Sequence, residues 1–280
     1  MQKKLLFVII GTSNQVLRST IMNQIERHQA IIELVNQQGF LTIEALAKHF
    51  EVTPQTIRRD LNQLDEENRL KRYHGGAGIP ENSSTHNTAY AERKIHNFAE
   101  KTRIAQTIAQ HIPNHSSLFI NIGTTTETIA HALMQHTGLT VITNNLHVAS
   151  IMSSKDDFNV IIAGGVVRHR DGGIIGDATV DFVRQFKVDI AVIGISGIDE
   201  DGDLLDFDYQ EVRVAQTIVD HSRQIFLAAD HSKFGRNAMI RMGNIGNATH
   251  LFTDQSPPDS VIRVMKERDV QLVLATQPLE

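Results

Sequence analysis

The chain has 280 residues, of which 41% are hydrophobic and 21% charged, a composition typical of globular proteins and unlike that of disordered or collagen-like chains. Its 27 Lys and Arg residues against 32 Asp and Glu residues give a net charge of −5, so any contact with nucleic acid requires a local basic face. The absence of Cys excludes disulfides, thiol nucleophiles and cysteine-ligated metal sites.

The N-terminal segment contains one short apolar run, Leu5–Ile10. A membrane-spanning helix needs about 20 apolar residues, so we expect no membrane association. The lack of Cys is compatible with the cytoplasm, where we expect the protein to act. Because Met22 stands directly before a helical pattern, residues 1–21 are interpreted as a non-native or disordered extension ahead of the native start.

Residues 22–79 contain three helical patterns, the first expected at about 23–38. Thr42 is a suitable N-cap for the second helix. Thr53 followed by Pro54 suits the start of the third, because proline at the first helical position loses no hydrogen bond. The segment Leu70–Gly76 then indicates a short β-hairpin, or wing. This order predicts a winged helix-turn-helix domain.

The third helix and the wing carry a basic, polar surface. Cations lie near the start of the helix and in the wing, whereas acidic residues lie toward the helix's far end, as expected of a recognition helix whose first turns meet DNA. The residues predicted to contact DNA are Thr53, Gln55, Thr56, Arg58, Arg59, Lys71, Arg72 and His74. The alternative is a small helical domain with a solvated charged face.

A polar segment at 80–92 is interpreted as a linker to a second domain at 93–277. In this second domain, helical segments alternate with seven short apolar runs that mostly lack period-two alternation, as in strands buried on both faces. These runs are Ser117–Ile122, Leu139–Thr143, Asn159–Ala163, Asp189–Gly194, Gln224–Ala229, His250–Thr253 and Val270–Ala275. The predicted class is α/β, an open, mostly parallel sheet with helices on both sides.

Small or polar residues follow most of the predicted strands. Ligands of open α/β sheets bind at the carboxyl ends of the strands, and a helix N-terminus there favours anions. Lys233 offers positive charge for a phosphate, and Asp206 and Glu211 offer acceptors for hydroxyl groups. The predicted effector-binding residues are Gly123, Thr124, Thr125, Thr126, Asn144, Gly164, Gly165, Gly194, Gly197, Asp206, Glu211 and Lys233. Taken singly, each of these loops is more often a tight turn or a helix cap.

Several nucleotide, hydrolase and metal motifs are missing from the sequence. There is no phosphate-binding P-loop motif and no dinucleotide-binding glycine motif after a strand. Ile198 stands where a nucleophile-elbow motif around Ser196 requires glycine. The 14 His residues include no His-Glu-x-x-His pair, so we expect neither a metal nor another cofactor.

The chain resembles the DeoR-type bacterial transcriptional regulators from about Met22 to Leu274. The segments that carry the resemblance are Thr53–Leu61, Arg72–Ala77, Ile122–Thr125, Thr143–Asn145, Ala163–Gly165, Arg170–Gly176, Gly194–Asp199, Leu205–Tyr209 and Asp230–Ala238. One departure from the family pattern is Asn121, where an acidic residue is common.

This resemblance implies a winged helix joined to an effector domain of the sugar-phosphate isomerase/CoA-transferase-like fold. It implies a repressor of glycerol-metabolism genes with operator DNA as its partner, glycerol 3-phosphate as its inducer and a homotetrameric assembly. We further expect one helix at Glu92–Gln110 to relay effector binding to the DNA-binding domain.

The alternative from another class is a sugar-phosphate isomerase or deaminase, for which Asp206, Glu211, Asp230 and His231 supply acid and base groups. An isomerase has no use for a capped recognition helix and a basic wing.

Overall fold

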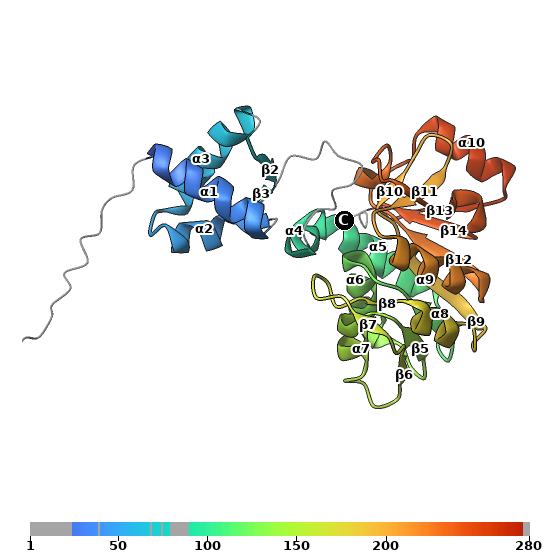
Figure 1. The fold of residues 1–280 in the computed structure, drawn as a ribbon. Helices are drawn as coiled ribbons and strands as arrows, with labels where there is room; N and C mark the ends of the chain where they lie inside the picture. Colours follow the sequence, from blue (N-terminus) through green and yellow to red (C-terminus); the bar gives the residue numbers. More distant parts are fainter. Residues whose placement is uncertain (1–23, 39, 68, 74, 79–89, 277–280) are drawn as a thin grey trace, which may run out of the picture.

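The computed structural model describes residues 24–38, 40–67, 69–73, 75–78 and 90–276. Figure 1 shows a small N-terminal unit beside a larger α/β domain, with helix α4 (Tyr90–Ile95) lying between them. The expected extension at 1–21, most of the expected linker and His74 lie outside the described residues. None of the helices within the described ranges is long and apolar enough to span a membrane.

The N-terminal unit is a winged helix-turn-helix, as predicted. Its elements are α1 (Gln24–Gln38), β1 (Phe40–Thr42), α2 (Ile43–His49), α3 (Pro54–Glu66), β2 (Lys71–Tyr73) and β3 (Gly76–Gly78). Thr42 caps α2 through a 3.0 Å bond from Ala45 N to its hydroxyl. Ile57, Leu61 and Leu64 of α3 are fully buried against the other two helices. The N-caps and the helical period of the apolar residues therefore account for the helices of this unit.

The wing is larger than the hairpin expected from the sequence. The strand β3 pairs antiparallel with β2 and also with β1, which completes a three-stranded sheet in the order β1-β3-β2. The strand β1 was missed because it has only three residues, and a three-residue stretch shows no periodicity.

The C-terminal domain is built on a parallel sheet of seven described strands in the order β15-β14-β12-β9-β4-β5-β6. The strands are β4 (Ser117–Ile120), β5 (Thr140–Thr143), β6 (Asn159–Ile162), β9 (Val188–Gly194), β12 (Ser222–Ala228), β14 (His250–Thr253) and β15 (Gln271–Leu274). Each corresponds to one of the seven predicted apolar runs. The chain builds outward from β4 in one direction and from β9 in the other, so the topological switch point lies between β4 and β9.

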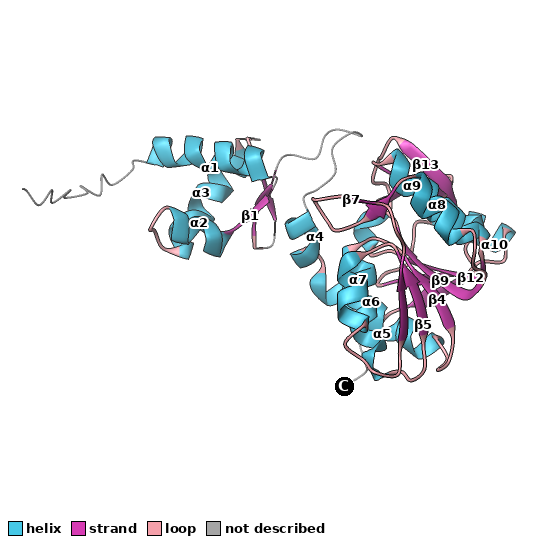
Figure 2. Ribbon diagram, turned by 60° about the horizontal axis from the view of Figure 1, so that its bottom comes forward, coloured by secondary structure: helices cyan, strands magenta, loops and turns pink. Residues whose placement is uncertain are grey.

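Helices cover both faces of this sheet (Figure 2). One face is covered by α5 (Phe98–His111), α6 (Thr124–Ala132) and α7 (Leu146–Met152). The other is covered by α8 (Asp177–Val183), α9 (Tyr209–Asp220) and α10 (Asp259–Glu267). Each face has its own buried cluster, with Phe226 in the first and Leu227 in the second. Consecutive residues of one strand thus point to opposite faces of the sheet and fill the two cores.

Two features of this domain differ from the expectation. The single helix expected at Glu92–Gln110 is wrong: α4 ends at Ile95 and α5 begins at Phe98, because Asn97 between them adopts a left-handed conformation with φ 52°. Short antiparallel pairs were also missed, namely β7 (Val166–Val167) with β8 (Ile174–Ile175), and β11 (Asp203–Asp206) with β10 (Gly197–Ile198) and β13 (Ile240–Asn244).

Candidate functional site

The N-terminal end of α3 presents an exposed polar surface. The Thr53 hydroxyl caps the helix by accepting a 3.2 Å bond from Thr56 N, and Gln55, Arg58 and Arg59 are exposed. A hollow of about 310 Å³ beside the cap is lined in part by Gln55, Thr56 and Arg59. The predicted recognition residues on this helix therefore face outward, except for Thr56, which is half-buried by its contact with the cap.

Asp60 fixes α3 to α1 through a buried ion-pair cluster. Its carboxylate lies 2.6 Å from Arg27 Nε and 3.1 Å from His28 Nε2, and the residue is 1% exposed. Burial acts to raise the pKa of Asp60, but the hydrogen bonds from Arg27 and His28 outweigh it and hold the pKa below its usual range. The cluster positions the recognition helix, and it leaves Arg58 and Arg59 outside.

In the wing, Lys71 and Arg72 are exposed and belong to β2. Asp65 at the end of α3 accepts a 2.9 Å bond from Arg72 N and lies 3.4 Å from Lys71 Nζ. This carboxylate therefore ties the first wing strand to the recognition helix, while the Arg72 side chain extends away on the surface. His74, the remaining predicted DNA contact, lies outside the described residues.

A second polar site lies where β4 and β9 diverge. Gly123 after β4 has φ 152°, a value that favours glycine, and it directly precedes α6. Asn121 crosses the switch point by accepting a 3.2 Å bond from the backbone N of Gly194, the last residue of β9. The Thr126 hydroxyl donates to the Asn121 and Gly123 carbonyls, which closes the loop. The loops predicted after these two strands are thus in direct contact.

Lys101 of α5 contacts the start of α6. It is 2% exposed, and its Nζ donates to Thr124 Oγ1 at 3.1 Å and to the Arg93 carbonyl. Burial, followed by the nearby charge of Lys233, lowers the pKa of Lys101 to about 7. The predicted Lys233 lies in the short 3-10 turn His231–Lys233 after β12, close enough to Lys101 for its charge to act on that lysine.

Asp230 stands at the end of β12 beside these cations. It is fully buried and accepts hydrogen bonds from Asn97 Nδ2 at 2.8 Å and from Ser232 N at 3.0 Å. Burial acts to raise the pKa of Asp230, but the charge of Lys233 and the bonds from Ser232 and Asn97 lower it well below its usual range. This carboxylate also anchors the break between α4 and α5.

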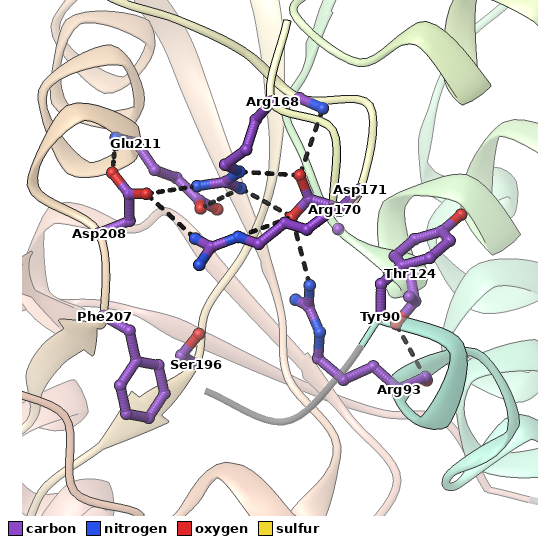
Figure 3. A network of polar contacts seen from close by, with 12 residues as sticks. Tyr90, Arg93, Thr124, Arg168, Arg170, Asp171, Ser196, Phe207, Asp208 and Glu211 are labelled. Atoms are coloured by element: carbon purple, nitrogen blue, oxygen red, sulfur yellow. Dashed lines mark hydrogen bonds and ion pairs between the residues drawn. The ribbon is translucent and has the colours of Figure 1, made fainter. Parts of the chain in front are cut away.

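A network centred on Arg168 closes the other side of the site (Figure 3). The Arg168 guanidinium lies 2.7 Å from both Asp171 Oδ2 and Glu211 Oε2, and 2.8 Å from Asp208 Oδ2. Burial acts to lower the pKa of Arg168, but these carboxylates raise it. Arg170 also reaches Asp208, at 3.0 Å. The predicted Glu211 is therefore engaged by an arginine of the same chain.

Asp206 and Glu211 lie close enough to interact electrostatically. Burial, then the charge of Asp206, raises the pKa of Glu211 to about 7 against the opposing charge of Arg168. Burial also raises the pKa of Asp206, which accepts bonds from Ser196 Oγ at 3.1 Å and Phe207 N at 2.7 Å. Glu211 can thus bind a proton near neutral pH and then donate a hydrogen bond, and Asp206 binds a proton more readily than an ordinary aspartate does.

The other predicted residues occupy structural positions at strand ends. Asn144 is buried and donates to the Ile174 carbonyl at 3.0 Å. A Cβ on Gly165 would lie 2.2 Å from Thr179 Oγ1, and one on Gly197 would lie 2.1 Å from the Arg236 carbonyl oxygen. These glycines are thus required by close packing, whereas a Cβ on Gly164 would meet nothing within 4 Å. Thr125, like Thr124 and Thr126, is buried in the first turn of α6.

The prediction missed Arg93, Lys101, Arg168 and Asp171. Lys101 had a signal, because it stands three, four and seven residues before Ile104, Ala105 and Ile108, on the apolar face of α5. A lysine on such a face is rarely fully buried without a role. Arg168 had no such signal, since its partner Glu211 lies 43 residues away.

No group of three or more His, Asp or Glu side chains in the described ranges is placed to hold a metal ion.

Two family models match the chain. Residues 27–83 match the DeoR-like helix-turn-helix domain, and residues 96–255 match the DeoR C terminal sensor domain. Among solved structures, ribose 5 phosphate isomerase A from Neisseria gonorrhoeae aligns with a TM-score of 0.35 and 13% identity, covering 48% of this chain and 52% of that one.

The chain is also similar to curated proteins along most of its length. It is 54% identical over 253 residues to the glycerol-3-phosphate regulon repressor of Escherichia coli strain K12, covering 90% of this chain and 100% of that protein. It is 48% identical to the protein of the same name from Haemophilus influenzae, covering 90% and 98%. The chain therefore belongs to the DeoR family of helix-turn-helix transcriptional regulators.

Proposed function

We propose that the protein is a DNA-binding transcriptional repressor of genes for glycerol and glycerol 3-phosphate metabolism, and that glycerol 3-phosphate releases it from operator DNA. The observation that carries this proposal is the 54% identity to the E. coli glycerol-3-phosphate regulon repressor across that protein's full length. The similarity thus spans both the recognition helix and the strand-end loops, rather than one domain alone.

The winged helix supplies the contacts with DNA. Arg58, Arg59 and Gln55 are exposed on the first turns of α3, where a recognition helix meets base edges in the major groove. Arg pairs with guanine through two bonds, and Gln pairs with adenine in the same way. Lys71 and Arg72 of the wing neutralise phosphates and add affinity without selecting a sequence.

The strand-end loops supply the effector site. Lys233 and Lys101 bring positive charge to the N-terminus of α6, and that helix end itself attracts anions. Asp206 lies beside Ser196, which follows β9, and Glu211 lies close to Asp206; these two carboxyl groups serve the hydroxyl groups of a polyol. The effector releases the operator by binding more tightly to an arrangement of the domains that does not fit DNA.

The comparisons argue against the isomerase alternative. The two full-length relatives are named repressors, and the helix-turn-helix domain has no role in aldose–ketose isomerisation.

We further propose a homotetramer that occupies paired operator half-sites in the cytoplasm. Sedimentation equilibrium of the full chain tests the assembly.

Fluorescence anisotropy with promoter DNA from the host's glycerol-utilisation genes tests the function. We expect binding that is sequence-selective, weakens with salt and weakens further with glycerol 3-phosphate. A reporter gene under the same promoter then tests repression. An absence of DNA binding together with heat released on mixing with sugar phosphates would favour the enzyme instead.

The variant Lys233→Ala should separate induction by glycerol 3-phosphate from operator binding. Since Lys233 lies on the effector domain after β12, its loss should abolish induction and spare operator binding. Loss of operator binding as well would contradict this division between the domains.

A further inference from the structure

Helix α4 lies between the winged helix and the effector domain and contacts both (Figure 1). It packs against β1 of the winged helix and against α6 of the effector domain. Directly after α4, the ring of His96 packs edge-on against Tyr73 of β2, with ring centres 5.9 Å apart. The position of the winged helix therefore depends on how the effector domain holds α4.

Tyr90, the first residue of α4, attaches this helix to α6 and α7. Its hydroxyl donates a 2.7 Å hydrogen bond to Glu127 Oε2 in the first turn of α6. Its ring stacks on His147 of α7, with ring centres 5.3 Å apart and planes 11° apart. Burial and then the Glu127 carboxylate raise the pKa of Tyr90, so the hydroxyl keeps its proton and stays a donor.

Glu127 is in turn held by the loops after two neighbouring strands. Its backbone N donates to the Gly123 carbonyl at 3.0 Å, in the loop after β4. Its Oε1 accepts a 3.4 Å bond from Asn145 Nδ2, in the loop after β5. Asn145 also caps α7, since its Oδ1 accepts a 2.9 Å bond from His147 N. Glu127 is only 5% exposed, so a shift of either loop is passed to its carboxylate and from there to Tyr90.

The rest of α4 is attached by other groups. Arg93 Nη2 lies 3.3 Å from Asp171 Oδ2, and Asn97 Nδ2 donates to Asp230 Oδ1 at 2.8 Å. A variant that loses the Tyr90 hydroxyl therefore keeps α4 on the effector domain. What it loses is the connection of the first turn of α4 to Glu127.

We propose that the hydrogen bond between Tyr90 and Glu127 couples the effector site to the winged helix, with Tyr90 as the positioning residue that sets α4. The inference rests on the proposed function and deepens it, because it names a contact through which effector binding reaches the DNA-binding domain. Tyr90 acts through Glu127 and does not itself contact the effector. An effector that moves Gly123 or Asn145 changes the geometry at Glu127 and so favours one position of α4 over another.

Tyr90→Phe tests the coupling, because it removes the hydroxyl and keeps the ring that stacks on His147. Fluorescence anisotropy of the full-length protein on operator DNA, with and without glycerol 3-phosphate, gives the factor by which the effector weakens operator binding. This factor should shrink roughly fivefold or more, since a hydrogen bond to a charged partner is lost. A purely structural role for the hydroxyl would lower the melting temperature and leave the factor unchanged, which would overturn the proposal.

Tyr209→Phe is the matched control. It removes a hydroxyl in the same way, from an exposed tyrosine that begins α9. The factor by which glycerol 3-phosphate weakens operator binding should equal that of the wild type. An equal loss of this factor in Tyr209→Phe and Tyr90→Phe would contradict a special role for the Tyr90 hydroxyl.

A double-mutant cycle tests whether the two residues act together. Glu127→Gln removes the charge of the acceptor, and it should reduce the same factor when introduced alone. Added to Tyr90→Phe, it should reduce the factor little further, because the contact is already broken. Losses that simply add would mean that Glu127 and Tyr90 act separately, and the coupling contact would be wrong.

Tyrosine labelling reports on the contact directly. The chain has three tyrosines and no tryptophan, so ¹⁹F NMR of the fluorotyrosine-labelled protein gives few resonances, which the Tyr90→Phe and Tyr209→Phe variants assign. Glycerol 3-phosphate should shift the Tyr90 resonance and leave that of Tyr209 in place. A Tyr90 resonance that stays unchanged while the effector is bound would overturn the proposal.

The outcomes separate this inference from the proposed function. If glycerol 3-phosphate weakens operator binding equally in the wild type and in Tyr90→Phe, the coupling contact is wrong and the repressor assignment stands. If the wild type binds operator DNA and glycerol 3-phosphate has no effect on it, the effector assignment fails and this inference fails with it. Should Glu127→Gln not fold, Tyr90→Phe and the Tyr90 resonance decide the question.

Discussion

Arg93 Nη2 on α4 lies 3.3 Å from Asp171 Oδ2 in the loop that follows β7. This ion pair connects the helix next to the DNA-binding unit to the Arg168 network over the strand ends (Figure 3). Asp171 is 2% exposed and Arg93 is partly buried, so the pair is shielded from solvent. The position of α4 therefore depends on an ion pair between its Arg93 and Asp171 of the Arg168 network.

Asp171→Asn should destabilise the effector domain more than Arg93→Gln does. The first change removes one of the two carboxylates that lie 2.7 Å from the buried Arg168 and also the partner of Arg93, at a cost of about 3 kcal/mol. The second leaves Asp171 still paired with Arg168, and we expect about 1 kcal/mol. Urea unfolding followed by circular dichroism measures both. Equal losses would mean that Arg93, not Arg168, is the main partner of Asp171.

Asp60→Asn should lower the stability of the winged helix by about 3 kcal/mol, because Arg27 and His28 would lose their buried carboxylate. Operator binding should weaken with it, since α3 loses its anchor to α1. Glu66→Gln is the control on the same helix, where the side chain is exposed. Thermal unfolding of the three proteins gives the comparison, and an unchanged melting temperature for Asp60→Asn would argue against this anchor.

Arg58→Ala and Arg59→Ala should weaken operator binding with no loss of stability, because both side chains are exposed. An arginine that contacts a base should cost about 1–3 kcal/mol and relax selectivity at one position. An arginine that contacts a phosphate should instead reduce the slope of log affinity against log salt concentration by about one. Anisotropy titrations at several salt concentrations distinguish the two. Arg263→Ala on α10, also exposed, should leave both quantities unchanged.

The stability of the effector domain should depend on pH through Glu211. Its pKa is raised to about 7 by burial and by Asp206, from an ordinary value near 4.5, so the folded state binds this proton more tightly than the unfolded chain does. The stabilisation is fully present below about pH 4.5 and is lost as the pH rises through about 7. Glu211→Gln should therefore flatten the decline between pH 5 and 7, which urea unfolding at a series of pH values measures. Parallel curves for the two proteins would contradict the raised pKa.

Gly165→Ala should destabilise the protein by about 1–3 kcal/mol, because the new methyl would collide with Thr179 and the Ile175 carbonyl. Its φ of 150° adds backbone strain for any residue with a side chain. Gly164→Ala, one position earlier, meets open space and should be tolerated. Thermal unfolding compares them, and similar melting temperatures would remove the packing explanation for Gly165.

Much of the fold follows from the sequence because it depends on local patterns. Thr53 and Pro54 start the recognition helix whatever the rest of the chain does, since a cap needs only its own first turn. The seven apolar runs become the seven parallel strands because strands buried on both faces carry no polar alternation. The exposed arginines of α3 follow from the same helical period.

Strand order and ion-pair partners required the tertiary structure. That β4 lies beside β9, which places Asn121 next to Gly194, depends on pairing between distant segments that no local pattern encodes. Asn97 and Asp230 are 133 residues apart, and their contact exists only after the helices pack on the sheet. Burial itself is also a tertiary property: it shifts the pKa of Lys101 and Glu211, and it separates Gly165, required by packing, from Gly164, which is not.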